Sequence, residues 1–435
     1  MVTRDEESPV TRAMERLWRA IEERQGELVS LVADLVRRPS PLGQEAAAQA
    51  YVAEHLRASG LSVQSWDLDA HIRALPEGGD SGVPLAGRPN VAGTLHGAGQ
   101  GRSLILNGHI DVVSPEPVTA WTHDPWGAEI VAGRMYGRGA FDMKSGIALN
   151  LFLARLLHDL GITLHGDLIV QSAIEEECTG IGSLDMSRRF RADAALVTEP
   201  ECLRFTWAHL GVLWFRVQVT GKSAHAMIAP QGVNAIIKTL PVIAALQELE
   251  VRLNADIHPA WQHIAHPINL NIGVIRGGDW PSTVPGACEL HCRLGFFPDQ
   301  PITQMRASIE AAIQTAAMAD DWLRAHPPTI TYDGFQSSGS MLSLDEPSVQ
   351  TLAHWHRRVI GTEMETVVGT SINDMRYFNF VGIPAGCYGA TGGNGHGADE
   401  WLDLASLVPA AKVIGGFLLD WCGVAPTIGG DESRD

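Results

Sequence analysis

The chain has 435 residues and a formal net charge of −18, and 45% of its residues are apolar. This length predicts two or three domains with a sizeable core. The acidic balance argues against a nucleic-acid-binding surface, and the apolar content excludes a disordered or collagen-like chain.

The first half of the chain alternates between helix and strand patterns. Apolar residues at helical spacing predict helices over 12–37, 44–59 and 145–160. Short apolar runs predict strands over 61–66, 103–107, 167–174 and 194–197. Uninterrupted apolar strands between helices are typical of a parallel sheet that is covered on both faces. We therefore predict an α/β domain.

The pattern changes after about residue 210. Apolar and polar residues alternate over 214–220, as expected of an antiparallel sheet with one wet face. Further strands are predicted over 268–275 and 287–294, and helices over 231–252 and 301–318. Mixed helix and strand patterns resume at 329 and end in a helix over 404–421. The sequence thus predicts an α+β unit (210–328) inserted into an α/β domain formed by 1–209 and 329–435.

The cysteines and the first residues of the chain indicate the cellular compartment in which the protein is expected. The six cysteines are scattered, and no uncharged apolar run is long enough to cross a membrane. The first residues are charged where a secretion signal needs an apolar segment. We expect a cytoplasmic protein with free thiols and no membrane partner.

Acidic and histidine residues follow the predicted strands at five points, where α/β folds place ligands. These are His109 with Asp111, Asp142 in a Gly-rich turn, Glu175–Glu177, Glu199 and His396. Such side chains from separate strand ends can close around metal ions. Because the set contains no thiolate, it favours Zn²⁺, Co²⁺ or Mn²⁺.

Each cluster alone also has a structural explanation. A single histidine after a strand is more often a hydrogen-bonded structural residue, and Asp142 can cap a helix. The run Glu175–Glu177 can be a solvated loop, but three adjacent carboxylates repel one another unless a cation lies nearby. The five clusters in series favour the metal-site interpretation.

The ordered motifs GHIDVV, GRGAFDMKSG, EEECTGIGS, TEP and GNGHGADE resemble those of a known enzyme family. This is the acetylornithine deacetylase, succinyl-diaminopimelate desuccinylase and aminoacylase family of dinuclear zinc metallohydrolases, and the resemblance covers nearly the whole chain. It implies a zinc-exopeptidase-like α/β catalytic domain with a mainly parallel central sheet. It also implies an inserted lid domain that is often used for dimerisation.

The resemblance implies two divalent metal ions per chain, with Zn²⁺ expected and Co²⁺ or Mn²⁺ as alternatives. Asp142 resembles the carboxylate that bridges both ions. His109 and Glu199 would complete one site, and Glu177 and His396 the other. The peptide bond after Asp142 is expected to be cis.

Two further residues resemble catalytic groups of the family. Asp111 resembles the carboxylate that orients the imidazole of His109. Glu176 resembles the general base that takes a proton from the attacking water. The family's Asp-Glu-Glu is replaced by Glu175-Glu176-Glu177. A shift of the register by one residue would make Glu175 the base and Glu176 the ligand.

The resemblance also extends to the lid domain. His225, in GKSAHA, resembles a lid histidine that donates a hydrogen bond to the oxyanion, commonly from the other subunit. Arg293 resembles the arginine that holds a substrate carboxylate, and Asn271 resembles a polar lid contact.

A loop near the C-terminus departs from the family. Residues 369–374 read GTSIND, where the family usually has GTSD or GGTD, so two residues are inserted near the expected substrate. Its candidate contacts are Thr370, Ser371 and Asn373. For Arg376 and Trp280 a structural role is favoured over a substrate contact.

The sequence therefore predicts a metal-dependent amide hydrolase that removes an N-acyl group from an amino acid or related amine. Its partners would be a small N-acylated substrate and a second copy bound through the lid. A dipeptidase or carboxypeptidase of the same family is the alternative, because the same site cleaves peptide bonds. N-carbamoyl hydrolysis is less favoured, and the intact residue set argues against a non-catalytic metal-binding scaffold.

Overall fold

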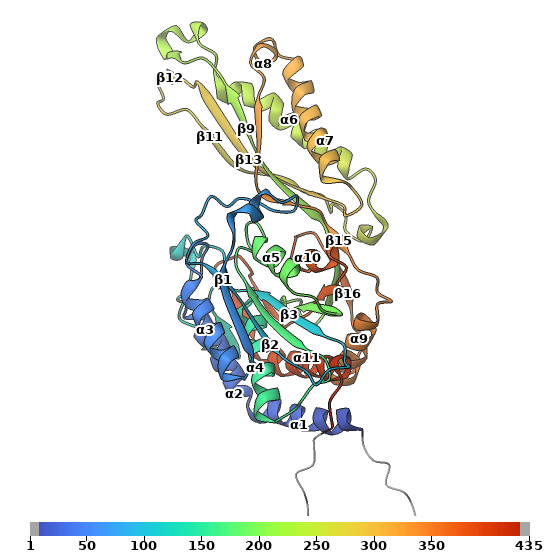
Figure 1. Ribbon diagram of the computed structural model, residues 1–435. Coiled ribbons are helices and arrows are strands. Elements are labelled where there is room, and N and C mark those ends of the chain that lie inside the picture. The colour runs from blue at the N-terminus through green and yellow to red at the C-terminus, as the bar shows by residue number, and fades with distance from the viewer. Residues whose placement is uncertain (1–7, 427–435) are drawn as a thin grey trace, which may run out of the picture.

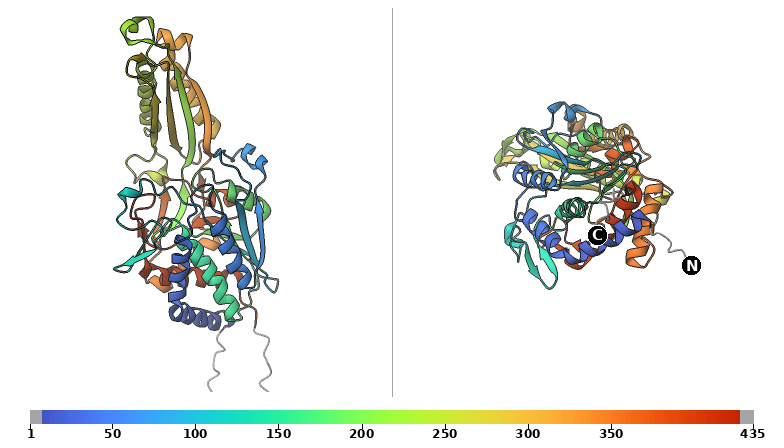
Figure 2. Two further views of the ribbon diagram at one scale, coloured as in Figure 1. Left: turned by 90° about the vertical axis from the view of Figure 1, so that its left-hand side faces the viewer. Right: turned by 60° about the horizontal axis from the view of Figure 1, so that its bottom comes forward.

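The computed structural model describes residues 8–426. Residues 1–7 and 427–435, which the sequence analysis assigned to the α/β domain, lie outside the described range. The chain forms a larger unit and a smaller unit that extends from one end of it (Figures 1 and 2). Helix α1 lies at the opposite end of the larger unit (Figure 1).

The larger unit is built on a mixed sheet whose middle strands are parallel. There β3 pairs in parallel with β6 and β7, and β7 with β17. At one edge β2 pairs antiparallel with β1 and β6. The strands are β1 (Ser62–Asp67), β2 (Pro89–Leu95), β3 (Leu104–His109), β6 (Leu168–Ala173), β7 (Ala194–Val197), β8 (Phe205–His209), β15 (Ser340–Met341), β16 (Thr366–Gly369) and β17 (Ala385–Cys387). The predicted α/β class is confirmed, although the sequence did not indicate β2.

Helices cover both faces of this sheet. One face carries α1 (Pro9–Glu23), α2 (Gln25–Val36), α3 (Ala46–Ala58), α4 (Lys144–Asp159), α9 (Pro347–Ile360) and α11 (Leu407–Cys422). The other carries α5 (Ile181–Arg189) and α10 (Met375–Phe380). Along β3, Leu104 and Leu106 join the first core and Ile105 the second, which explains the uninterrupted apolar run. The single helix predicted over 12–37 is two helices that meet at Arg24.

Helix α11 is part of a long apolar segment. By length and composition, Leu404–Cys422 could cross a membrane, but 67% of its most apolar window is buried inside the protein. It packs against α1, α4 and α9. This burial is typical of a core helix. The six cysteines are free thiols, as predicted.

The smaller unit is an antiparallel sheet with the order β11-β13-β9-β14 and helices on one face. Its elements are β9 (Gly211–Thr220), β11 (Leu270–Gly277), β13 (Ala287–Phe296), β14 (Thr329–Ser337), α6 (Ala235–Leu253), α7 (Ile302–Met318) and α8 (Asp321–Ala325). This confirms the predicted separate antiparallel sheet. The inserted sheet extends past the predicted end at 328, because β14 pairs with β9. That pairing joins segments distant in sequence, so the local pattern could not reveal it.

A small antiparallel sheet, with the order β18-β19-β5-β4, completes the larger unit. It consists of β4 (Glu129–Val131), β5 (Arg134–Tyr136), β18 (Gly392–Gly393) and β19 (Trp401–Asp403). Strands of two or three residues carry too little pattern for prediction from sequence. The sheet brings the segment that leads to Asp142 beside the segment that contains His396.

Candidate metal centre

Five predicted metal ligands lie at one edge of the larger unit. His109 ends β3, Glu177 follows β6 and Glu199 follows β7. Asp142 lies just before α4, and His396 lies between β18 and β19. Because parallel strands end at the same edge of a sheet, residues far apart in sequence meet there.

Asp142 lies between the two histidines. Its Oδ1 is 3.2 Å from Nε2 of His109, and its Oδ2 is 3.4 Å from Nε2 of His396. Oε2 of Glu177 is 3.0 Å from Nε2 of His396, and Oε1 of Glu199 is 3.7 Å from Nε2 of His109. The five side chains thus form two groups that share Asp142, and these are the two groups implied by the resemblance. The peptide bond Asp142–Met143 is cis, as expected.

The donor set fits divalent cations. One potential ligand atom each from His109, Asp142 and Glu177 lies within 4.8 Å of the others. Imidazole and carboxylate donors suit Zn²⁺, Co²⁺ and Mn²⁺. Burial opposes protonation of His109, but Glu199 and Asp142 outweigh it and hold the pKa of His109 well above its usual value. Hydrogen bonds to Asp142 and Glu177 raise the pKa of His396 to about 11. Protons and a metal ion therefore compete for the same imidazole nitrogens.

Metal binding is expected to release protons at neutral pH and to weaken as the pH falls. Both histidines have raised pKa values in the metal-free chain, so each holds a proton that a ligating imidazole must lose. Saturation should release at least two protons per chain, and the ligand Glu199, whose pKa burial also raises well above its usual value, adds to this number. Calorimetric titration of the metal-free chain with Zn²⁺, in buffers of different ionisation enthalpy, measures this number.

Two variants and one control make this measurement specific. His109→Ala and His396→Ala should each lower the release by about one proton. The exposed His225 serves as the control, and His225→Ala should leave the release unchanged. A wild-type release in His396→Ala would contradict the ligand role of that residue.

Glu176 lies beside the ligands, in a turn that Asp111 holds. The backbone N–H groups of Glu176 and Glu177 donate to Oδ1 and Oδ2 of Asp111, both at 3.1 Å. Burial raises the pKa of Glu176 well above its usual value. A buried carboxyl group with a raised pKa is suited to accept a proton and to return it.

The contacts of Asp111 differ from those expected. Nδ1 of His109 is 2.8 Å from the backbone carbonyl oxygen of Asp111, whereas the carboxylate Oδ1 is 3.7 Å away. The main chain therefore provides the closer contact that orients the imidazole. The carboxylate of Asp111 instead fixes the turn that carries Glu176 and Glu177. Burial raises the pKa of Asp111 to about 7.

Glu175 makes its contacts outside the ligand group. Its Oε1 accepts hydrogen bonds from Arg88 Nη1 at 2.6 Å and from Ser81 Oγ at 3.0 Å. Its Oε2 accepts one from Thr179 Oγ1 at 2.8 Å. Since both carboxylate oxygens are engaged there, the geometry favours Glu176 as the base over the shifted register.

The predicted lid residues fall in two separate places. Asn271 and Arg293 face each other across β11 and β13 and line a cleft of about 480 Å³. Cys178, which follows Glu177, lines the same cleft from the larger unit.

His225 lies elsewhere in the smaller unit. It is exposed on β10 (Ala224–His225), which pairs with β12 (Thr283–Val284). Figure 1 shows β12 at the end of the smaller unit remote from the central sheet. A single chain therefore does not bring His225 to the five ligands.

The loop over 369–374 makes mostly internal contacts. The carbonyl oxygen of Thr370 accepts from Arg293 Nη2 at 3.2 Å. Oδ1 of Asn373 accepts from the N–H of Met375 at 3.1 Å, at the start of α10. Ser371 is exposed. The structure thus gives Asn373 a structural contact, and only the backbone of Thr370 meets a predicted substrate residue.

The two additional candidates, Arg376 and Trp280, have opposite exposures. Arg376 is fully buried and donates to Ser337 Oγ at 3.0 Å and to the carbonyl oxygen of Asn373. These contacts give it the structural role that the sequence favoured. Trp280 is 68% exposed.

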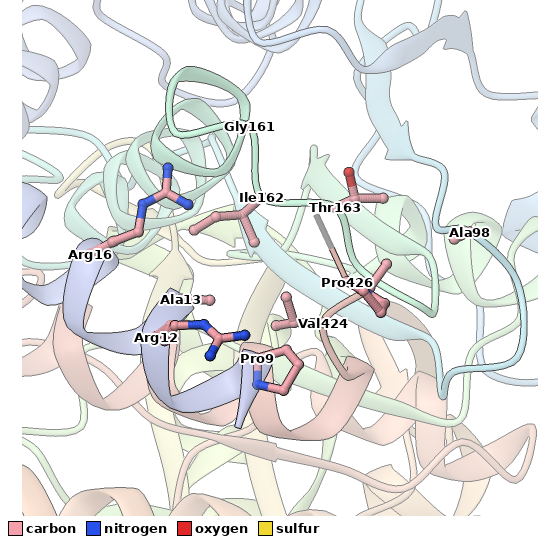
Figure 3. Close-up of a pocket in the computed structure, with 11 residues that line it drawn as sticks. Pro9, Arg12, Ala13, Arg16, Ala98, Gly161, Ile162, Thr163, Val424 and Pro426 are labelled. Carbon is pink, nitrogen blue, oxygen red and sulfur yellow. The ribbon is translucent and has the colours of Figure 1, made fainter. Parts of the chain in front are cut away.

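Another cavity, of about 550 Å³, lies between α1 and the end of the described chain (Figure 3). Arg12 and Arg16 from α1 and Val424 to Pro426 contribute to its lining. Its described lining residues include no histidine, cysteine or carboxylate side chain. They offer no metal ligand and no general base, so the candidate site is the centre around Asp142.

Buried ion pairs that the sequence patterns do not reveal lie behind the site. Arg88 pairs with Glu45 and Glu175, and Arg138 pairs with Glu400. Arg138 and Glu400 both stand inside the motifs quoted above, GRGAFDMKSG and GNGHGADE. In the sequence, each of these two residues is visible only as a charged residue within a Gly-rich loop. No local pattern identifies its partner.

Comparisons with known proteins agree with this geometry. The model of peptidase family M20/M25/M40 matches residues 105–420. N-formyl-4-amino-5-aminomethyl-2-methylpyrimidine deformylase from Halalkalibacterium halodurans is 30% identical, covering 94% of this chain and 97% of that protein. Acetylornithine deacetylase from Salmonella typhimurium is 31% identical, covering 58% of this chain and 66% of that protein. The structure of human carnosine dipeptidase 1 shares the fold, with a TM-score of 0.74 and 15% identity, covering 94% of this chain and 98% of that chain.

Proposed function

The chain belongs to peptidase family M20/M25/M40, whose metal-dependent members hydrolyse amide bonds, and from this premise we propose that it removes a formyl group from a small heteroaromatic amine. The observation that carries the proposal is the pair of histidine–carboxylate groups that share Asp142, with the buried Glu176 beside them. This arrangement provides metal ligands and a general base at one place.

The extent of similarity favours a deformylase over a deacetylase. The relatives named as deformylases, from Halalkalibacterium halodurans and Bacillus subtilis, match almost the whole of this chain and of their own. The acetylornithine deacetylases match little more than half of this chain. The substrate class proposed here is therefore an N-formylated aminomethylpyrimidine or a similar formylated arylmethylamine.

The residues of the chain can be assigned to the steps of such a hydrolysis. A bound divalent ion would polarise the amide carbonyl and make water easier to deprotonate. Glu176 takes a proton from the attacking water and delivers it to the nitrogen of the leaving amine. Asp111 holds Glu176 in place through the backbone N–H. We assign the amine part to the cleft lined by Asn271 and Arg293, because Cys178, the neighbour of Glu177, lines the same cleft.

We further propose that a second copy of the chain supplies His225. Strand β11 is an edge of the inserted sheet. Exposed apolar side chains on or near this strand and α6 include Ile237, Leu240, Val274, Ile275 and Trp280. An unpaired edge strand beside exposed apolar side chains is suited to pair with another chain. Such a dimer would account for a catalytic histidine far from the ligands of its own chain.

A dipeptidase is the second candidate. Arg293 in the cleft offers a guanidinium for a substrate carboxylate, a group that dipeptides and N-acyl amino acids carry. The aminomethylpyrimidine proposed above carries none.

A substrate panel distinguishes the two candidates. The chain, loaded in turn with Zn²⁺, Co²⁺ or Mn²⁺, is assayed with the N-formyl aminomethylpyrimidine, N-formylbenzylamine, N-acetylornithine and dipeptides. We expect kcat/KM for the formylated pyrimidine to exceed those for N-acetylornithine and the dipeptides by at least roughly tenfold, because the relatives that match nearly the whole chain are named for that substrate. The matched control is N-acetyl aminomethylpyrimidine, which changes the acyl group alone. A higher kcat/KM for dipeptides would replace the deformylase proposal by the second candidate.

A further inference from the structure

Arg138 and Glu400 form a buried ion pair behind the metal centre. Their side chains are 2% and 1% exposed, and Nη1 of Arg138 is 2.6 Å from Oε2 of Glu400. Neither residue belongs to the proposed ligands or bases. Removing two charges from water is costly, so a buried pair of this kind needs further hydrogen bonds to compensate it. Those hydrogen bonds lead directly to two of the proposed ligands.

On one side, the pair holds the backbone of Asp142. Oε1 of Glu400 accepts hydrogen bonds from the N–H groups of Phe141 and Asp142, both at 3.0 Å. The carboxylate of Glu400 therefore fixes the main chain at the residue whose own carboxylate lies between the two histidines.

On the other side, the pair holds the loop of His396. Nη2 of Arg138 donates to the carbonyl oxygens of His396 at 3.1 Å and Gly397 at 3.0 Å. His396 has a φ of +63°, a conformation that is unfavourable for a residue with a side chain. Its side chain is 55% exposed, so packing contributes little to its position. The contacts from Arg138 are well placed to hold this loop.

The small sheet sets the position of the ion pair. Tyr136 of β5 lies opposite Trp401 of β19. One residue beyond this pair in each segment, the N–H of Gly137 donates to the carbonyl oxygen of Glu400 at 2.9 Å. Arg138 and Glu400 are thus the residues at which the two paired segments turn toward the metal centre.

We propose that Arg138 and Glu400 are positioning residues that keep Asp142 and His396 at metal-binding distance. The inference rests on the proposed function only in requiring that the centre binds a divalent ion. When the pair is broken, the group formed by His396, Glu177 and Asp142 loses its geometry. The group formed by His109 and Glu199 is held by separate strand ends and keeps more of its affinity.

The test is Zn²⁺ binding, measured without any substrate. Arg138→Met keeps the length of the side chain but removes its charge and its donors. The metal-free variant is titrated with Zn²⁺ against a competing chelator. We expect affinity at one Zn²⁺ site to fall roughly 10- to 100-fold, as is usual when a group that orients ligands is removed. His396→Ala identifies the affected site, because it should weaken the same one.

Conservative variants separate positioning from general destabilisation. Arg138→Lys keeps the charge but cannot reproduce the forked contacts, so its affinity should lie between those of Arg138→Met and the wild-type chain. Glu400→Gln keeps an acceptor for the N–H groups of Phe141 and Asp142 and should also be intermediate. If Arg138→Met fails to fold, Arg138→Lys and Glu400→Gln provide the same test.

The control is Val413→Ala in the fully buried core of α11. It should lower Tm while both Zn²⁺ affinities stay at the wild-type value. Wild-type affinity at both sites in Arg138→Met, or a loss confined to the site that His396→Ala leaves intact, would overturn the inference. Because the readout contains no substrate, failure of the deformylase proposal leaves this result interpretable.

Discussion

Glu176→Gln is expected to lose nearly all hydrolytic activity while it binds as much Zn²⁺ as the wild-type chain. The substitution preserves the size of the side chain and leaves the backbone hydrogen bond to Asp111 in place. It removes the carboxylate that takes the proton from water, a contribution of roughly 10²- to 10⁴-fold in rate. The measurement combines kcat on the best substrate of the panel with the metal content of the same preparation.

Two further variants make this result specific. Glu54→Gln on the exposed face of α3 makes the same chemical substitution and should leave activity unchanged. Glu177→Gln should lower both metal content and activity, because Glu177 contacts His396. If Glu176→Gln lost metal to the same extent as Glu177→Gln, Glu176 would be a ligand and the role of base would have to be reassigned.

His225→Ala should lower kcat by roughly 10²- to 10³-fold, the usual loss for one donor to the oxyanion. Zn²⁺ content should not change, because His225 is exposed and far from the ligands of its own chain. His263→Ala, at another exposed histidine of the smaller unit, is the matched control and should retain full activity.

Subunit mixing tests whether His225 acts across a dimer. A mixed dimer of His225→Ala and Glu176→Gln contains one site with both groups intact. Equal mixing of the two nearly inactive variants should therefore restore about a quarter of the wild-type activity, since about half of the dimers are mixed and each has one working site. Absence of recovery, in a preparation shown to exchange subunits, would mean that His225 acts within its own chain or not at all.

The positions of the candidate ligands could be predicted because their signal is local. His109 ends β3 and Glu199 comes just after β7, and parallel strands end at one edge of the sheet. Knowledge of a family's motifs then grouped Asp142 with both histidines. The structure places the side chains in that grouping.

The rest depends on contacts between segments far apart in sequence. Nothing near Arg138 indicates Glu400 as its partner, and nothing in the pattern of β14 indicates that it pairs with β9. The role of Asp111 could not be derived either, because its carboxylate meets backbone N–H groups, which every residue but proline carries. Sequence patterns located these residues without revealing what they touch.

The path of the chain through the two units has a consequence for biosynthesis. The inserted unit runs without interruption from β9 to β14, so it can fold as soon as it has left the ribosome. The central sheet cannot be completed then, because β15, β16 and β17 come after the insertion. His396 and Glu400 are made later still. A chain that stops short of them can hold a finished inserted unit yet lacks residues of the candidate metal centre.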